Sequence, residues 1–69
     1  MLAIERRNEI LEKLQNDRRV VVSELSQIYE VSEETIRRDL DKLVQYGFAM
    51  KSYGGAVINE NVNIELPDE

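Results

Sequence analysis

The sequence predicts an α+β domain with three helices and a small antiparallel sheet that ends in a C-terminal β-hairpin. Two observations support this fold class. Apolar residues recur at helical spacing in three segments before residue 47. After that residue, polar and apolar residues alternate with a period of two. The 69 residues fit one small domain with a modest core.

The first helix is expected over residues 3–16, and Asn16-Asp17 marks its end. Its apolar positions at helical spacing are Ile4, Ile10, Leu11 and Leu14. The β-branched run Val20-Val21-Val22 follows, and it is long enough only for a small strand.

Two further helices follow, each preceded by a serine suited to an N-cap. Ser23 precedes the second helix, expected over about residues 24–30, where Leu25 starts an apolar stripe that continues with Ile28 and Tyr29. Ser32 precedes the third helix, expected over about residues 33–46. Gly47 stands where a helix C-terminus favours a left-handed residue.

The last element is a hairpin in which Gly54-Gly55 is the turn signal and Ala56-Val57-Ile58 is the returning strand. The short link between the second and third helices matches a helix-turn-helix, over about residues 20–39. A hairpin directly after the third helix makes this a winged helix-turn-helix, with the run at 20–22 as a third strand. We expect the domain to cover residues 3–58.

The acidic excess lies mostly at the C-terminal end. The chain has a net charge of −5, but residues 59–69 hold four acids and no base. Residues 1–58 carry nine bases and ten acids, a net charge of −1. Residues 59–69 are therefore expected to form an acidic linker or tail, and the overall charge does not exclude a nucleic-acid partner.

Composition excludes several classes of function. The chain has no Cys and no His, which removes disulfides, most zinc sites, and the Ser-His-Asp and Cys-His nucleophile arrangements. We expect no enzyme activity and no cofactor. The longest apolar runs are three residues, far below the roughly 20 that span a bilayer, and no signal peptide is expected.

The third helix is expected to present cations on the side away from the core. At about 100° per residue, Arg38 lies almost opposite the centre of the stripe formed by Ile36, Leu40, Leu43 and Val44. Thr35 and Glu34 flank Arg38. In a major groove these three side chains would face base edges, and an Arg offers two donors to guanine O6 and N7. Arg37 and Lys42 would meet the phosphate backbone.

A simpler interpretation of the same helix stays open. Glu33 with Arg37 and Glu34 with Arg38 are both pairs spaced i, i+4, which stabilise a solvated helix by a few tenths of a kcal/mol. A salt-bridged surface helix would show the same residues. On this interpretation, Glu34 holds Arg38 in place instead of accepting a hydrogen bond from cytosine N4.

The predicted wing favours the nucleic-acid interpretation. Alternation places Lys51 and Tyr53 on an outward face, opposite Phe48 and Met50. Gly54-Gly55 would let the backbone approach a neighbouring surface closely. These four residues are therefore candidates for contacts with the phosphate backbone.

The starts of the two later helices supply further candidates. Ser23 and Ser32 are chiefly caps, but free N–H groups at a helix start also bind phosphate.

These residues together resemble the DeoR family of bacterial transcription repressors over about residues 3–58. The match is specific because Thr-Ile-Arg-Arg-Asp-Leu follows Val-Ser at the family spacing and a Gly-Gly-Ala wing comes after it. The matching residues are Arg7, Ile10, Leu14, Leu25, Val31-Ser32, Thr35-Ile36-Arg37-Arg38-Asp39-Leu40, Leu43, Gly47 and Ser52-Tyr53-Gly54-Gly55-Ala56. The wing differs from the family pattern, since Lys51-Ser52-Tyr53 stands where Arg and His are usual.

The resemblance implies a sequence-specific repressor that binds a double-stranded DNA operator of a sugar or nucleoside catabolic operon. It also implies a longer protein that is homo-oligomeric through a C-terminal domain absent from this chain. The expected effector is a phosphorylated sugar bound by that domain, and the expected location is the bacterial cytoplasm, at the nucleoid. The alternative is a winged helix that docks other proteins without binding DNA, which its weak dependence on salt would reveal.

Overall fold

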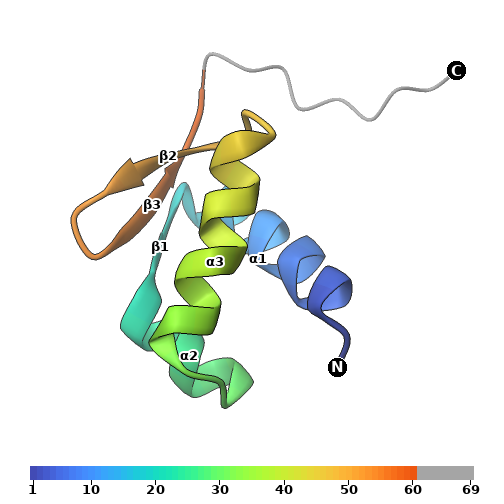
Figure 1. The fold of residues 1–69 in the computed structure, drawn as a ribbon. Helices are drawn as coiled ribbons and strands as arrows, with labels where there is room; N and C mark the ends of the chain where they lie inside the picture. Colours follow the sequence, from blue (N-terminus) through green and yellow to red (C-terminus); the bar gives the residue numbers. More distant parts are fainter. Residues whose placement is uncertain (61–69) are drawn as a thin grey trace, which may run out of the picture.

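The computed structural model describes residues 1–60 and forms three helices and three strands (Figure 1). In chain order the elements are α1 (Ala3–Asp17), β1 (Arg19–Val21), α2 (Val22–Tyr29), α3 (Glu33–Gln45), β2 (Ala49–Ser52) and β3 (Gly55–Ile58). This is the predicted winged helix-turn-helix. No helix within residues 1–60 has the length and apolar character needed to cross a bilayer.

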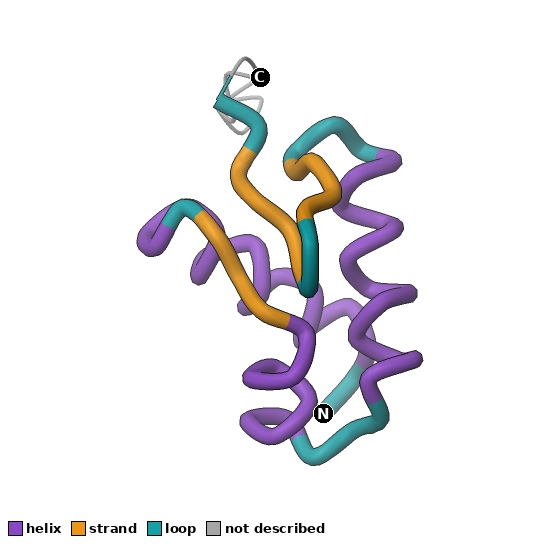
Figure 2. Tube along the Cα trace, turned by 90° about the vertical axis from the view of Figure 1, so that its left-hand side faces the viewer, coloured by secondary structure: helices purple, strands orange, loops and turns teal. Residues whose placement is uncertain are grey.

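The sheet is antiparallel and has the strand order β1-β3-β2, so the last strand of the chain lies in the centre. Val20 pairs with Ala56, and Ala56 pairs in turn with Lys51. The β2–β3 hairpin forms the wing and lies beside α3 (Figure 2). The wing is therefore tied along one edge to β1.

A single hydrophobic core joins all six elements. Its buried members are Ile10, Leu14, Val20, Val22, Leu25, Ile36, Leu40, Leu43, Ala49, Ala56 and Ile58. Two apolar residues of the predicted stripes lie outside it, since Ile4 is 58% and Ile28 56% exposed. Each lies on a helix face that no other described element covers.

The two ends of α3 follow the sequence prediction. The Ser32 hydroxyl accepts a hydrogen bond from the Thr35 backbone N–H at 3.1 Å, as an N-cap does. At the other end Gly47 has φ +87°. The N–H groups of Gly47 and Phe48 donate to the carbonyls of Val44 and Leu43, both at 3.0 Å. This pattern is a Schellman motif, which stops the helix at a defined residue.

The predicted start of α2 was wrong. The helix begins at Val22, one residue before Ser23, and Val21 is its N-cap residue. Ser23 lies inside the first turn, where its carbonyl accepts a hydrogen bond from the Ser26 hydroxyl. The reason is tertiary. The strand β1 runs directly into α2, Val22 is buried, and its N–H donates to the Gly54 carbonyl at 2.9 Å.

The faces of the hairpin also differ from the prediction. The turn is formed by Tyr53 and Gly54, and Gly55 is the first residue of β3, paired with Ser52. Ala49 is buried and Met50 is 50% exposed, so Met50 lies on the outer face of the sheet. The bulky Met50 was expected inside, but the register with β3 pairs it with Val57 on the outer face and pairs Ala49 with the buried Ile58.

The C-terminal end of β3 is fixed to the end of α3. The Asn59 side-chain amide donates to the Gly47 carbonyl at 3.1 Å, and its backbone N–H donates to the Phe48 carbonyl at 3.0 Å. Asn59, the first residue of the predicted tail, therefore contacts the domain directly. Glu60 is also among the described residues, and residues 61–69 of the predicted tail lie outside them.

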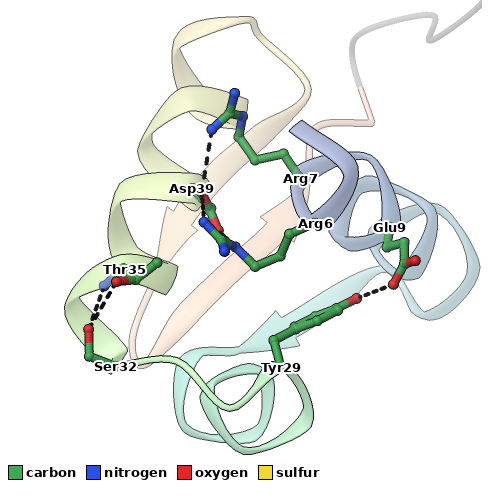
Figure 3. Close-up of polar contacts among 7 residues, drawn as sticks. All are labelled: Arg6, Arg7, Glu9, Tyr29, Ser32, Thr35 and Asp39. Atoms are coloured by element: carbon green, nitrogen blue, oxygen red, sulfur yellow. Dashed lines mark hydrogen bonds and ion pairs between the residues drawn. The ribbon is translucent and has the colours of Figure 1, made fainter. Parts of the chain in front are cut away.

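A buried ion pair joins α1 to α3 (Figure 3). The Asp39 side chain is only 3% exposed and accepts hydrogen bonds from Nε and Nη2 of Arg6, the second at 3.2 Å. Nη1 of Arg7 lies 3.5 Å from Oδ1 of the same carboxylate, the oxygen that also accepts from Nη2 of Arg6. The hydrogen bond to Asp39 raises the pKa of Arg6 above its ordinary value.

A second polar contact joins α1 to α2. The Tyr29 hydroxyl donates to a Glu9 carboxylate oxygen at 3.1 Å (Figure 3). Partial burial of the phenol, together with this hydrogen bond, raises the pKa of Tyr29 to about 12 from an ordinary value of 10.0.

We expect Asp39→Asn to lower the free energy of unfolding by about 3–5 kcal/mol, because it leaves two partly buried guanidinium groups without their anion. That is a large share of the stability of a domain of this size. Urea unfolding followed by circular dichroism measures the change. Asp41→Asn on the same helix removes an exposed carboxylate and serves as the control, with an expected loss below about 1 kcal/mol. Equal losses for the two variants would contradict the role of Asp39.

Tyr29→Phe should flatten the alkaline part of the stability profile. The neutral phenol is favoured in the folded state, so its contribution is complete below about pH 10 and is lost as pH rises toward about 12. Urea unfolding at a series of alkaline pH values tests this, with Tyr53→Phe as a control at a fully exposed ring. An unchanged alkaline slope in Tyr29→Phe would show that this contact does not couple to folding.

Candidate nucleic-acid interface

The exposed side of α3 carries Arg38, as the helical arithmetic predicted. The Arg38 side chain is 77% exposed, and its Nε lies 3.6 Å from an Oε2 of Glu34, one turn earlier. The opposite side of the helix is packed into the core through Ile36, Leu40 and Leu43. The guanidinium therefore projects away from the domain, and within residues 1–60 its one ion pair is this solvent-exposed contact.

Thr35 lies differently from Arg38. Its side chain is half-buried, and its hydroxyl is 3.0 Å from the Ser32 hydroxyl at the start of α3 (Figure 3). Both hydroxyl groups are thus engaged with each other at the N-cap. Thr35 also lies on the side of α3 that turns toward α1, where Asp39 follows it one turn later.

A second stripe of α3 faces the wing. It consists of Glu33, Arg37 and Asp41, which are spaced four residues apart. Nη2 of Arg37 donates to Oε1 of Glu33 at 3.2 Å, and the two side chains are 58% and 48% exposed. Arg37 therefore lies on the wing side of the helix.

A groove separates this stripe from the wing. Its lining comes from α3, the start of α2 and the hairpin, and consists of Val21, Val22, Ser23, Glu33, Arg37, Leu40, Asp41, Lys51, Ser52, Gly54 and Gly55. The Nζ of Lys51 reaches across to an Oδ1 of Asp41 at 3.3 Å. The two cations and two carboxylates of the groove balance, so its net charge is zero.

The tip of the wing points into solvent. Tyr53 is fully exposed, and Gly54 has φ +78°, which favours glycine in the turn. Gly55 has a different role. A Cβ at this position would lie 2.0 Å from the Val20 carbonyl oxygen, so glycine is needed for β3 to pair with β1. Gly55 is part of the sheet and is only half exposed.

The structure therefore brings most of the predicted residues to one side of the molecule. The groove collects Ser23, Arg37, Lys51, Gly54 and Gly55. The neighbouring exposed stripe of α3 carries Glu34, Arg38 and Lys42. Within residues 1–60 no group of three or more acidic side chains is arranged to hold a metal ion.

Sequence reasoning missed two carboxylates. Asp39 was not assigned a partner, although the structure places Arg6 and Arg7 around its carboxylate. Asp41 was not singled out, although it contacts the wing. A charged residue at position 39, on the side of the helix next to the apolar stripe, was the available signal for a buried ion pair.

Comparison with known proteins gives the family. Residues 6–62 match the model of the DeoR-like helix-turn-helix domain. The chain belongs to the DeoR-like helix-turn-helix family. No solved structure matches the chain significantly.

Several relatives of this DeoR-like domain are named as transcription regulators, and each is longer than this chain. The chain is 49% identical over 66 residues to the uncharacterized HTH-type transcriptional regulator YulB of Bacillus subtilis, covering 96% of this chain and 26% of that protein. It is 46% identical over 54 residues to a putative aga operon transcriptional repressor of Escherichia coli O157:H7, covering 78% and 20%. It is 39% identical over 56 residues to a putative galactitol utilization operon repressor of Escherichia coli K12, covering 81% and 50%.

The DeoR-like chain thus spans about a quarter or less of the first two of these relatives. All three names are those of transcription regulators and none is that of an enzyme. DNA binding in transcriptional regulation is the class of function of this domain. A winged helix that only docks proteins receives no support.

Gly55→Ala should destabilise the DeoR-like domain by about 2 kcal/mol or more, because the new methyl group overlaps a backbone carbonyl that cannot rotate away. Gly54→Ala is the comparison, since its Cβ meets nothing within 4 Å and only the positive φ opposes it, at about 1 kcal/mol. Thermal unfolding of both variants measures the difference. Equal destabilisation would show that close packing of β3 on β1 is not limiting.

Proposed function

We propose that this domain binds a double-stranded DNA operator with α3 in the major groove and the wing on the phosphate backbone. The observation that carries the proposal is the 77% exposure of Arg38 on the side of α3 opposite the core. A planar guanidinium in this position suits bidentate donation to O6 and N7 of a guanine. The buried side of α3 is packed on the core, so the exposed side of the helix keeps one orientation relative to the domain.

Glu34 and Thr35 are proposed to take part beside Arg38. The Glu34 carboxylate, 3.6 Å from Arg38, either orients the guanidinium or accepts a hydrogen bond from cytosine N4. When the Ser32 hydroxyl donates to Thr35, the Thr35 hydroxyl keeps its own hydrogen for an acceptor on a base edge.

The phosphate contacts are proposed to come from three places. Lys42 follows Arg38 on the exposed stripe of α3. Arg37 lies on the neighbouring stripe of α3, which lines the groove. Lys51, Tyr53 and the exposed backbone at Gly54-Gly55 form the wing contact. At the helix starts, Ser23 and Ser32 would act through backbone N–H groups of the first turn, because the Ser32 hydroxyl is used as a cap.

For the whole protein, we propose repression of a catabolic operon for a sugar or nucleoside. The names of two relatives, each an operon repressor, support this proposal. The part absent from this chain would form the homo-oligomer and bind a phosphorylated sugar. Two copies of the domain would then occupy related half-sites, and avidity would offset the acidity of each copy. Cytoplasmic action at the nucleoid follows from an operator as the partner.

The test is fluorescence anisotropy with a duplex selected by the wild-type domain from a random pool and a scrambled duplex of equal composition. Arg38→Ala should cost about 1–3 kcal/mol on the selected duplex and little on the scrambled one, because it removes a base contact. Lys51→Ala should weaken both duplexes similarly and reduce the dependence on salt, because it removes a phosphate contact.

Arg19→Ala is the matched control for this test. Arg19 is exposed on β1 and lines a hollow with Met50 and Val57 on the outer face of the sheet, away from α3. It should bind both duplexes nearly as the wild type does. Equal losses on the two duplexes for Arg38→Ala would contradict its role in reading bases.

A further inference from the structure

The wing is connected to α3 by one ion pair within residues 1–60, between Lys51 and Asp41. The two residues come from different elements, and the Nζ to Oδ1 distance is 3.3 Å. The pair spans the groove between α3, which carries Asp41, and strand β2, which carries Lys51. An anion that binds Lys51 in the groove therefore also lies close to the Asp41 carboxylate.

This ion pair is exposed to water. The Lys51 side chain is 74% and the Asp41 side chain 57% exposed, so the contact contributes little to the stability of the fold. The wing is already held by β3, which pairs with both β1 and β2. A role in stability is thus a weak explanation for a carboxylate at this position.

The charge balance of the groove points to another role. Arg37 is paired with Glu33 at 3.2 Å in the same groove. Both cations of the groove, Arg37 and Lys51, therefore face a carboxylate in the free protein. The same arrangement recurs next to the groove, where Glu34 holds Arg38. Lys42, in contrast, makes no ion pair in the described part of the chain.

We propose that Asp41 sets the affinity of the domain for DNA by competing with backbone phosphate for Lys51. This inference rests on the proposed function and names a residue that weakens the proposed binding to DNA. A phosphate that approaches Lys51 must displace or share the ammonium with Asp41, and it also meets repulsion from the carboxylate. Since every duplex has the same backbone, the cost applies to all sequences alike.

Two carboxylates of α3 therefore act on different properties of DNA binding. Asp41 lowers binding to every duplex without changing the preference among them. Glu34 touches the proposed base-reading side chain instead, and so acts on the preference itself. A domain with weak backbone affinity stays off non-specific sites unless base contacts or a second copy add to binding.

The experiment uses Asp41→Asn, with Asp17→Asn as a matched control. Asp17 is an exposed aspartate at the end of α1 that lines the outer hollow of the sheet, so its variant makes the same charge change away from the groove. Binding is measured by anisotropy on a short mixed-sequence duplex over a range of salt concentrations. No knowledge of the operator is needed, because the predicted effect is independent of sequence.

Asp41→Asn should bind the mixed-sequence duplex about 3–10-fold more tightly at low salt. The slope of log affinity against log salt should become steeper by up to about 0.9, the value for one more phosphate neutralised. Asp17→Asn should change affinity less than about twofold. Asp41→Glu, which keeps the charge, should stay near the wild type.

A double-mutant cycle tests whether Asp41 acts on DNA binding through Lys51. In a Lys51→Gln background, the gain from Asp41→Asn should largely disappear, because the cation over which the two anions compete is gone. A gain that persists there, or one no larger than that of Asp17→Asn, overturns the proposal. Urea unfolding of Asp41→Asn should stay close to the wild type, and weaker binding by a folded variant would also overturn it.

The outcomes separate the two levels of the argument. Absence of any salt-dependent binding by the wild type would overturn the proposed function and this inference with it. Binding by the wild type that weakens in Lys51→Gln, without a gain in Asp41→Asn, would overturn this inference alone.

Discussion

The orientation of α3 depends on the buried carboxylate of Asp39. Two arginines of α1 hold this group from one side of the helix, and the apolar stripe beside it is packed on the core. Adjacent residues on a helix point about 100° apart, so fixing Asp39 inward also fixes the direction of Arg38. A buried ion pair adds little net stability compared with apolar packing, but it has strict geometry. Here the ion pair and the apolar stripe lie on neighbouring sides of α3 and together leave the Arg38 side facing solvent.

Most of the secondary structure could be predicted from the sequence because its determinants are local. The Ser32 cap, the left-handed Gly47 and the apolar stripe of α3 all lie within one or two turns of the residues they affect. The exposure of Arg38 follows from the same periodicity. The path of the hairpin was also predictable in outline, since its turn residues are adjacent in the sequence.

What could not be predicted depends on contacts between distant segments. Asp39 and Arg6 are 33 positions apart, and no local pattern joins them. The observed start of α2 differs from the predicted one because strand β1 leads directly into the helix. The buried face of β2 is set by its register with β3, which pairs Ala49 with the buried Ile58 and leaves Met50 on the outer face. The contact between Asp41 and Lys51 has the same origin, since it needs the wing to lie against α3.

The central position of β3 has a consequence for how the chain acquires its structure. Arg19 pairs with Val57, so the first strand has no neighbour until nearly the whole domain has been synthesised. Pairing over such a separation is slow compared with helix formation. Both β1 and β2 have β3 as their partner in the sheet, so the sheet closes only once residues 55–58 have been made.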